Sequence, residues 1–187
     1  MTDWDKRYER EENAKEEPHP LVMEFASNLA PGRALDIACG VGRHAIWLAE
    51  REWQVTAVDS SPVAIEILRR RANEKGLEID SRIADLEARE FVIAPDSYDL
   101  ILNCRYLQRD LFPAIRAGAR FGGMVIAIIA MADGDPDVKP MNPAFLLNPG
   151  ELRAEFEGWD IVFEFEGKPL GDTGRRSMAQ LVARRPR

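Results

Sequence analysis

Short apolar runs alternate along the chain with longer segments in which apolar residues recur at helical spacing. Such runs, bounded by Gly, Pro, Asp or Asn, are typical of buried strands. Strands are predicted over residues 33–38, 54–58, 78–84, 98–103, 124–130, 160–166 and 177–183. Because helices separate most of them, the pattern indicates an α/β fold with a mostly parallel sheet. The last connection has little room for a helix, so the last two strands are expected to pair antiparallel.

The segments between the strands predict helices over residues 4–16, 20–29, 43–52, 62–75, 111–119 and 149–156. Pro20 and Pro62 suit a first helical turn, and Ser60 or Ser61 can cap the helix that begins at Pro62. Residues 131–148 are rich in Pro, Gly, Asp and Asn. A loop of that length in a compact domain usually serves function, so it is predicted to form part of a lid. The whole chain, 1–187, is expected to form one domain.

Composition narrows the class of protein. The 187 residues are 45% hydrophobic, the formal charge is −7 and the isoelectric point is about 5.0. An acidic balance argues against nucleic acid or an anionic membrane as the main partner. No apolar run is long enough to cross a bilayer, and the first 17 residues lack an apolar signal core. The pattern therefore favours a cytoplasmic protein, and its oligomeric state, monomer or homodimer, is left open.

The few cysteines and histidines do not form a metal-binding pattern. Cys39 and Cys104 lack paired spacing, and His19 and His44 lie far apart in the sequence, so no metal is expected. If their strands are neighbours, the two cysteines lie close together at the strand ends. They then form either a redox-sensitive pair or, more simply, two buried thiols. His44 is expected to pack at the start of its helix.

The segment Ala34–Arg43 predicts a buried strand, a glycine turn and the start of a helix. Gly40 and Gly42 allow a backbone to come close to a ligand, because glycine has no Cβ. Asp36 lies just before the glycines, where a carboxylate would repel a pyrophosphate and attract an ammonium group. The sequence therefore predicts a ligand that is cationic near the turn, as the amino-acid end of S-adenosylmethionine is.

A dinucleotide-binding site is the competing interpretation, because Gly40-x-Gly42-x-x-Ala45 also fits the dinucleotide fingerprint. Asp36 and the absence of a second substrate-binding half weigh against it. Asp59, at the end of the second predicted strand, fits both cofactors. It can accept hydrogen bonds from ribose hydroxyls, or it can cap the following helix.

The chain resembles the class I S-adenosylmethionine-dependent methyltransferases over nearly its whole length. The resemblance rests on the glycine motif at 35–42, in which Ala38 replaces the first glycine, and on the segments 55–59, 83–86, 98–101 and 121–123. It implies a single-domain Rossmann-like fold with helices on both faces of a seven-stranded sheet of order 3-2-1-4-5-7-6. It also implies an active site at the carboxyl ends of the first and fourth strands.

The resemblance further implies cofactor-binding residues and an activity. The cofactor S-adenosylmethionine would be held by Trp4, Arg7, Tyr8, Asp36, Ala38, Cys39, Gly40, Gly42, Asp59, Ser60, Asp85, Leu86 and Asn103, and the product would be S-adenosylhomocysteine. The segment Trp4-Asp5-x-Arg7-Tyr8 is similar to a lead-in helix of the small bacterial tellurite-resistance-type enzymes, so residues 1–18 are expected to cap the site. Those enzymes suggest a small acceptor with a soft sulfur, selenium or tellurium nucleophile.

The residues after the fourth predicted strand are candidates for binding the acceptor. Arg105 and Arg109 can hold an anion and Tyr106 can orient it, whereas the plainer interpretation is two surface arginines and a packed tyrosine. No general base is evident there, and a soft nucleophile would not need one. The same absence is compatible with a non-catalytic protein that binds S-adenosylmethionine as a sensor or partner-binding module. A NAD-dependent oxidoreductase is a further alternative.

Overall fold

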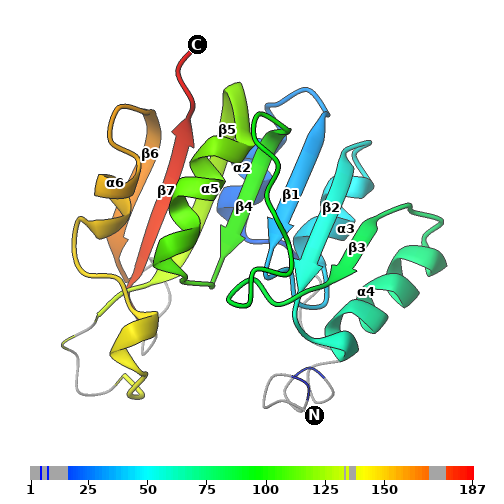
Figure 1. The fold of residues 1–187 in the computed structure, drawn as a ribbon, viewed down its shortest axis with the longest axis horizontal. Coiled ribbons are helices and arrows are strands. Elements are labelled where there is room, and N and C mark those ends of the chain that lie inside the picture. The colour runs from blue at the N-terminus through cyan, green and yellow to red at the C-terminus, as the bar shows by residue number, and fades with distance from the viewer. Residues whose placement is uncertain (1–4, 6–7, 9–16, 133, 135–137, 169–175) are drawn as a thin grey trace.

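A computed structural model describes residues 5, 8, 17–132, 134, 138–168 and 176–187. Its seven strands form one sheet in the order β3-β2-β1-β4-β5-β7-β6 (Figure 1). Strands β1 to β5 pair in parallel, and β7 is antiparallel to both β5 and β6. The predicted fold class, strand order and antiparallel end are therefore confirmed. The strands are β1 Arg33–Ile37, β2 Gln54–Asp59, β3 Asp80–Ile83, β4 Tyr98–Cys104, β5 Ala119–Ala130, β6 Asp160–Gly167 and β7 Met178–Arg184.

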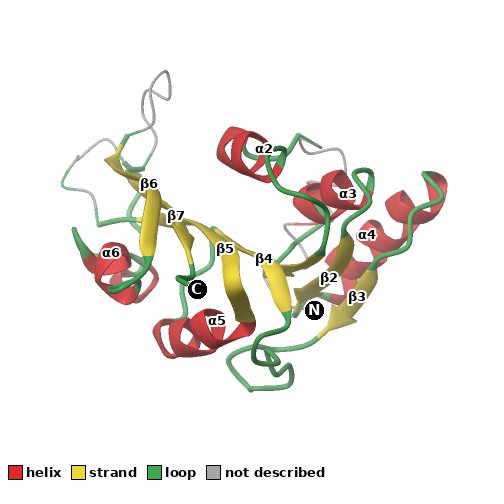
Figure 2. Cartoon of the chain, turned by 90° about the horizontal axis from the view of Figure 1, so that it is seen from above, coloured by secondary structure: helices red, strands yellow, loops and turns green. Residues whose placement is uncertain are grey.

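Helices cover both faces of this sheet. Figure 2 shows α2, α3 and α4 on one face and α5 and α6 on the other. The 3₁₀ turn η1 directly precedes α5 in the sequence, and a second 3₁₀ turn, η2, precedes α6. The bounds are α2 Pro20–Ala26, α3 Arg43–Ala49, α4 Pro62–Glu74, η1 Arg109–Leu111, α5 Phe112–Gly118, η2 Pro143–Phe145 and α6 Glu151–Glu155.

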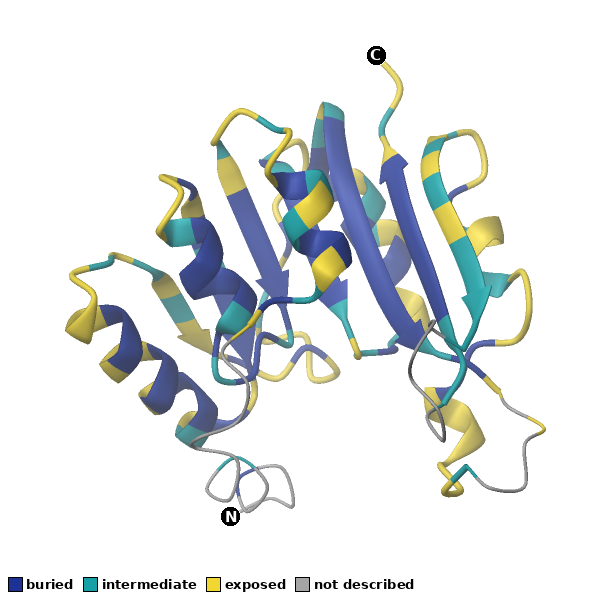
Figure 3. Ribbon diagram, turned by 180° about the vertical axis from the view of Figure 1, so that it is seen from behind, coloured by how far each residue is buried: buried dark blue, intermediate teal, exposed yellow. Residues whose placement is uncertain are grey.

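Each face of the sheet carries its own apolar core. Leu35 and Ile37 of β1 pack with α5 and α6 in one core, whereas Ala34 packs with α2, α3 and α4 in the other. Alternate residues of a strand point to opposite faces, so a strand covered on both faces is apolar throughout. Figure 3 shows the central strands as almost continuously buried. A strand of this kind holds the residue at its carboxyl end in a fixed position.

Several element boundaries differ from the sequence predictions. The helix predicted over 20–29 ends at Ala26, and β3 begins at Asp80 rather than at residue 78. Strand β5 begins at Ala119, five residues earlier than predicted, because its pairing with β4 continues across a register shift. Gly122 has a positive φ of 78° there, which only glycine adopts readily. The helix predicted over 4–16 lies outside the described residues except for Asp5 and Tyr8.

The predicted lid at 131–148 has regular structure in its described part. It contains η2, and Leu147 forms a parallel bridge with Met131 at the end of β5. In Figure 1 the yellow segment that carries η2 lies below the ends of β5 and β7. It therefore borders the carboxyl edge of the sheet. No helix among the described residues is long and apolar enough to span a membrane.

Candidate functional site

The turn between β1 and α3 depends on its glycines. Gly40 and Gly42 have φ values of 56° and 80°, and Ala38 joins them in the left-handed region at 50°. A Cβ on Gly42 would lie 2.1 Å from Leu68 Cδ1, and one on Gly40 would lie 3.1 Å from Tyr8 Oη. The backbone conformation and the close neighbours both require glycine at Gly42. Tyr8 of the N-terminal segment therefore lies against the glycine turn, where the sequence predicts the cofactor.

Asp36 lies beneath this turn and has no hydrogen-bond partner among the described residues. Its side chain is 1% exposed, and both carboxylate oxygens are unsatisfied. Burial raises its pKa from 3.8 to about 7, although the Arg43 charge acts in the opposite direction. Buried polar groups are almost always satisfied, so an orphaned carboxylate indicates that a partner is missing. The site can therefore receive a cationic hydrogen-bond donor.

Two histidines connect this carboxylate to the start of α2. His44 Nδ1 lies 3.9 Å from Asp36 Oδ1, and His44 Nε2 accepts a hydrogen bond from the His19 backbone amide at 3.3 Å. His19 Nδ1 in turn accepts from the Leu21 amide at 3.2 Å, at the start of α2. Burial and the Arg43 charge lower the pKa of His44 to about 3, so this imidazole is neutral. The predicted packing of His44 at a helix start is confirmed.

Asp59, at the carboxyl end of β2, binds two backbone amides. Its Oδ2 accepts from Gly40 N–H at 2.8 Å, and its Oδ1 accepts from Ser61 N–H at 2.9 Å. The cap of α4 is Ser61 itself, whose hydroxyl accepts from Ala64 and donates to Asp5 at 2.5 Å. Burial raises the pKa of Asp59, and the amides of Ser61 and Gly40 partly offset this. Asp59 thus ties β2 to the glycine turn, a contact that neither interpretation of the sequence included.

Asp85 and Leu86 follow β3 and lie in a tight turn. Asp85 is exposed, and its Oδ1 accepts from the Glu87 and Ala88 amides at 2.9 and 3.3 Å. The Leu86 carbonyl accepts from Gln108 Nε2 at 3.4 Å, and Tyr106 Oη donates to Gln108 Oε1 at 2.7 Å. Gln108 therefore joins the Leu86 turn to the segment after β4. No pattern in the sequence marks Gln108, because its partners lie in a distant turn.

Tyr106 is linked to the Leu86 turn by its hydrogen bond to Gln108. Burial raises the pKa of its phenol, and the negative charges of Glu87 and Asp85 raise it further. The phenol therefore stays protonated at neutral pH. Through Gln108 the phenol is joined to the Leu86 turn, and its predicted role in positioning the acceptor stays a prediction.

The carboxyl end of β4 adjoins that of β1, as predicted. Asn103 pairs with Ile37 in the sheet; it is 1% exposed and its Oδ1 has no hydrogen-bond partner among the described residues. Arg105, two residues on, is exposed and has a φ of 64°. The positive charges of Arg43 and Arg105 lower the pKa of His19 and His44. Both cationic side chains therefore act on the two histidines, and Arg43 also acts on the buried Asp36 carboxylate.

The two cysteines are both free and pack in the same core cluster. Burial raises the pKa of both thiols, and the Asp36 charge raises it further. Neither is a thiolate at neutral pH. The plainer interpretation of a small buried residue describes Cys39, whereas Cys104 is half-buried.

The remaining predicted site residues are Ser60, Arg109, Trp4 and Arg7. Ser60 is exposed at the carboxyl end of β2. Arg109 does not serve as an anion clamp, because its guanidinium donates to Glu151 and to the carbonyls of Ala144 and Leu146. That prediction is wrong for Arg109. Trp4 and Arg7 lie outside the described residues.

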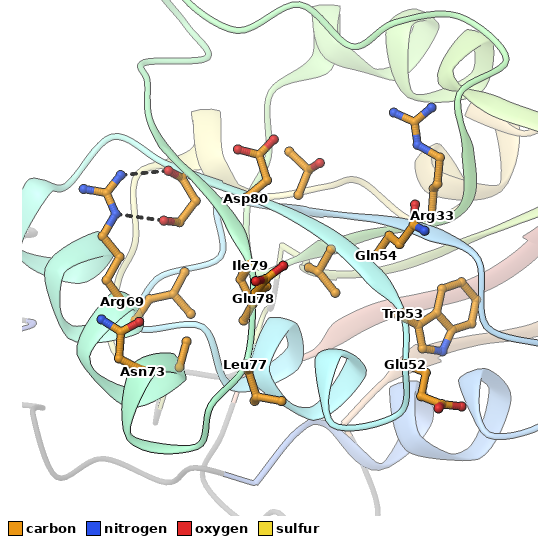
Figure 4. Close-up of a pocket in the computed structure, with 15 residues that line it drawn as sticks. Arg33, Glu52, Trp53, Gln54, Arg69, Asn73, Leu77, Glu78, Ile79 and Asp80 are labelled. Atoms are coloured by element: carbon orange, nitrogen blue, oxygen red, sulfur yellow. Dashed lines mark hydrogen bonds between the residues drawn. The ribbon is translucent and has the colours of Figure 1, made fainter.

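A hollow of about 710 Å³ lies at the other edge of the sheet (Figure 4). Its lining includes Arg33, Gln54 and Asp80, the first residues of β1, β2 and β3. The Arg69 side chain beside it already donates to Ser81 Oγ and to the Ser81 carbonyl, both at 2.8 Å. Ligands of parallel sheets bind at the carboxyl ends of the strands, so we assign no function to this hollow.

The fold and the site together define the class to which this protein belongs. The strand order, the antiparallel β7, the glycine turn after β1 and the acid at the end of β2 together make this an S-adenosylmethionine-dependent methyltransferase fold. The described residues contain no cluster of His, Cys, Asp or Glu that could hold a metal ion.

The family then follows from comparison with known proteins. The profile of the family described as "Tellurite resistance protein TehB" matches residues 3–175, and the chain belongs to this family. The protein named "Probable S-adenosyl-L-methionine-dependent methyltransferase TehB" of Haemophilus influenzae is 24% identical over 151 residues, which cover 77% of this chain and 51% of the relative. The chain thus spans about half the length of that relative.

Solved structures share the fold. The crystal structure of TehB from Haemophilus influenzae superposes with a TM-score of 0.79 at 23% identity, covering 97% of this chain and 67% of the other. A structure described as "Conversion of a Disulfide Bond into a Thioacetal Group during Echinomycin Biosynthesis" has a TM-score of 0.69 at 22% identity, covering 98% of this chain and 92% of the other.

Proposed function

We propose that this chain transfers the methyl group of S-adenosylmethionine to a small acceptor with a soft nucleophile. The observation that carries the proposal is the buried Asp36 carboxylate, which lacks a partner among the described residues beneath the glycine turn. The positive charge of Arg43 acts on this carboxylate, and Arg43 and Arg105 both act on the neighbouring His44. A ligand that brings both an ammonium and a carboxylate would match this arrangement, and the amino-acid end of S-adenosylmethionine brings both.

The rest of the cofactor would extend from the glycine turn along the ends of β2 and β3. Asp59 has one further lone pair on each oxygen, which ribose hydroxyls can fill while the amides of Gly40 and Ser61 stay bound. Ser60 lies beside it. The turn at Asp85 and Leu86 would hold the adenine, with Tyr106 alongside.

The turn residues Ala38, Cys39, Gly40 and Gly42 would line the methionyl end, with Asn103 opposite. Gly40 already lies against Tyr8, and Asp5 is bound to Ser61. The N-terminal segment therefore approaches the cofactor site at two described residues. We infer that Trp4, next to Asp5 in the sequence, and Arg7, next to Tyr8, act with Tyr8 to close it.

The two histidines near the site do not offer a base, which favours a soft nucleophile. His44 Nε2 and His19 Nδ1 each accept a backbone hydrogen bond, so the nitrogen that could take a proton is occupied. The raised pKa of Tyr106 keeps its phenol protonated. A thiolate or a reduced chalcogen anion attacks the methyl group in line without proton removal, and the protein then needs mainly to position and desolvate the reactants. Arg105 would hold such an anion.

Relatives of this chain also point to sulfur and its heavier neighbours. One structure of the same fold concerns the conversion of a disulfide bond into a thioacetal group, and the name of the family refers to tellurite. Both support, for this chain, an acceptor atom from the sulfur, selenium and tellurium group. Free cysteines and the lack of a membrane-spanning helix among the described residues fit a site of action in the cytoplasm.

Radiolabelled methyl transfer tests the proposal. Protein incubated with methyl-labelled S-adenosylmethionine and selenite, tellurite or a small thiol is expected to form S-adenosylhomocysteine in proportion to the methylated acceptor. Asp36→Asn should abolish this because a neutral amide cannot pair with the ammonium. Binding of S-adenosylmethionine without transfer to any acceptor would instead support the sensor, and binding of NADH would support the dinucleotide alternative.

A further inference from the structure

The Arg109 side chain holds η2 and the residue after it through hydrogen bonds to Ala144, Leu146 and Glu151. Its Nε donates to Glu151 Oε1 at 2.5 Å and its Nη2 donates to Glu151 Oε2 at 3.1 Å. Its Nη1 donates to the Ala144 carbonyl at 3.0 Å, and Nη2 also donates to the Leu146 carbonyl at 2.9 Å. One guanidinium therefore holds the backbone on both sides of Phe145.

The same segment is tied to the end of β5. The Leu147 amide donates to the Ala130 carbonyl and the Ala132 amide donates to the Leu147 carbonyl, both at 2.9 Å. The Asn142 side chain accepts from the Ala144 amide at 3.0 Å and caps η2. A 3₁₀ turn of three residues has little stability of its own, so these contacts determine its conformation.

Glu151 is the partner that holds Arg109 in place. It also accepts from the Asn148 amide at 2.9 Å and from Asn148 Nδ2 at 3.0 Å. The hydrogen bond from Arg109 holds the pKa of Glu151 below its usual value. Glu151, the first residue of α6, thereby joins the segment after β4 to the segment before α6.

The fixed backbone presents two exposed apolar side chains. Phe145 is 50% exposed and Met141 is 47% exposed, although each would gain from burial. The segment borders the carboxyl edge of the sheet at the end of β5 (Figure 1). An acceptor that attacks the methyl group must approach at that edge, beyond the cofactor.

We propose that residues 141–147 form the wall of the acceptor site, that Phe145 and Met141 select an apolar acceptor, and that Arg109 is the positioning residue for this wall. This inference rests on the proposed methyl transfer and adds, among its soft acceptors, a preference for one with an apolar body beside the soft atom. Arg109 acts through the Ala144 and Leu146 carbonyls and does not touch the acceptor.

The test compares two arginines that bind the same helix. Arg116 donates to the Glu155 carbonyl at 2.5 Å and to Glu155 Oε2 at 2.7 Å, so it also ties α6 through an ion pair. Both of these hydrogen bonds go to Glu155 and neither reaches residues 141–147. Arg109→Ala is the test variant, Arg116→Ala is the matched control, and Phe145→Ala removes an exposed ring without disturbing the core.

Benzyl mercaptan and 2-mercaptoethanol are suitable probes, because they differ in apolar body but have thiols of similar acidity. Wild-type protein is expected to have the lower KM for benzyl mercaptan. Arg109→Ala and Phe145→Ala should raise that KM about tenfold or more, as a misplaced wall disturbs the reacting geometry. Calorimetric affinity for S-adenosylhomocysteine should stay unchanged in both, and Arg116→Ala should match wild type throughout.

A charge-swapped double variant separates the ion pair from the other hydrogen bonds of Arg109 and Glu151. Arg109→Glu with Glu151→Arg restores opposite charges, but a glutamate cannot donate to the Ala144 and Leu146 carbonyls and an arginine cannot accept from Asn148. The double variant should therefore stay as impaired as Arg109→Ala. Amide hydrogen exchange should rise at Phe145, Leu146 and Leu147 in Arg109→Ala and not in Arg116→Ala.

Three results would overturn the inference. They are full recovery in the charge-swapped variant, an unchanged KM for benzyl mercaptan in Phe145→Ala, and equal KM values for the two thiols in wild-type protein. Wild-type protein that binds S-adenosylhomocysteine but methylates neither thiol would overturn the apolar thiol acceptor. Wild-type protein that fails to bind S-adenosylhomocysteine would instead overturn the proposed function.

Discussion

In the ligand-free protein, the free energy of unfolding should fall as the pH rises toward 7 because of Asp36. Asp36→Asn should remove this dependence on pH. Asp36 is 1% exposed and its two oxygens have no partner among the described residues. Its pKa in the folded protein is about 7, against 3.8 without burial. Above pH 3.8 the unfolded chain loses this proton while the folded protein still retains it, so stability falls as the pH rises toward 7.

The magnitude follows from the two pKa values. Between pH 5 and pH 8 this one group should lower the free energy of unfolding by about 2–3 kcal/mol, at about 1.4 kcal/mol for each tenfold change in the ionisation equilibrium. Well below pH 3.8 the group is protonated in both states and contributes little. Asp36→Asn cannot ionise, so this part of the pH dependence should be absent from the variant.

Urea unfolding at a series of pH values, without ligand, measures the difference. The variant's own amide is also buried and unsatisfied, so only the change between pH 5 and pH 8 is compared and not the absolute stability. Glu157→Gln changes an exposed carboxylate and should keep the wild-type dependence. Parallel pH curves for wild type and Asp36→Asn would refute the reasoning, because they would mean that Asp36 ionises normally.

The other predictions concern the turn, the ribose acid and the acceptor side. Gly42→Ala should lower stability by about 2–4 kcal/mol, because the residue has a positive φ and its new Cβ would lie 2.1 Å from Leu68 Cδ1. Gly76→Ala, where φ is 65° and the space is open, should cost only about 1–2 kcal/mol. Equal melting temperatures for the two variants would contradict this. Asp59→Ala should weaken S-adenosylmethionine binding by about 1.5–3 kcal/mol for each charged hydrogen bond lost, and wild-type affinity by calorimetry in folded variant would limit Asp59 to a structural role. Arg105→Ala should keep that affinity and lose turnover of anionic acceptors, and retained turnover across selenite, tellurite and thiols would exclude Arg105 as their clamp.

The sheet could be predicted from the sequence because its signals are local. Strands β1, β2, β4 and the second half of β5 are largely apolar runs, and the resemblance supplied the order of the strands. Strand β3 is polar and largely exposed, so its apolar signal is weak. Asp36 and the turn glycines are adjacent in sequence, so their joint position needed no tertiary information. The start of β5 at Ala119 was missed because Arg120, Gly122 and Gly123 are typical of a turn.

The contacts that complete the site are long-range, and no local pattern reveals them. Asp59 binds the Gly40 amide 19 residues away, and Ser61 binds Asp5 at a separation of 56 residues. Arg109 was interpreted as an anion clamp or a surface residue. Its real partner, Glu151, lies 42 residues further along the chain and becomes a neighbour only when β5 and the segment before α6 are folded.

Isothermal titration calorimetry with S-adenosylmethionine, wild type against Asp36→Asn, tests the central claim most directly. The account predicts dissociation in about the micromolar range for wild type at pH 8, as is common for enzyme ligands, and loss of binding in the variant. S-adenosylhomocysteine should bind in the same way, and NADH should give no heat. Folded wild-type protein that binds NADH and neither adenosyl ligand, or an Asp36→Asn variant with wild-type affinity, would contradict the account.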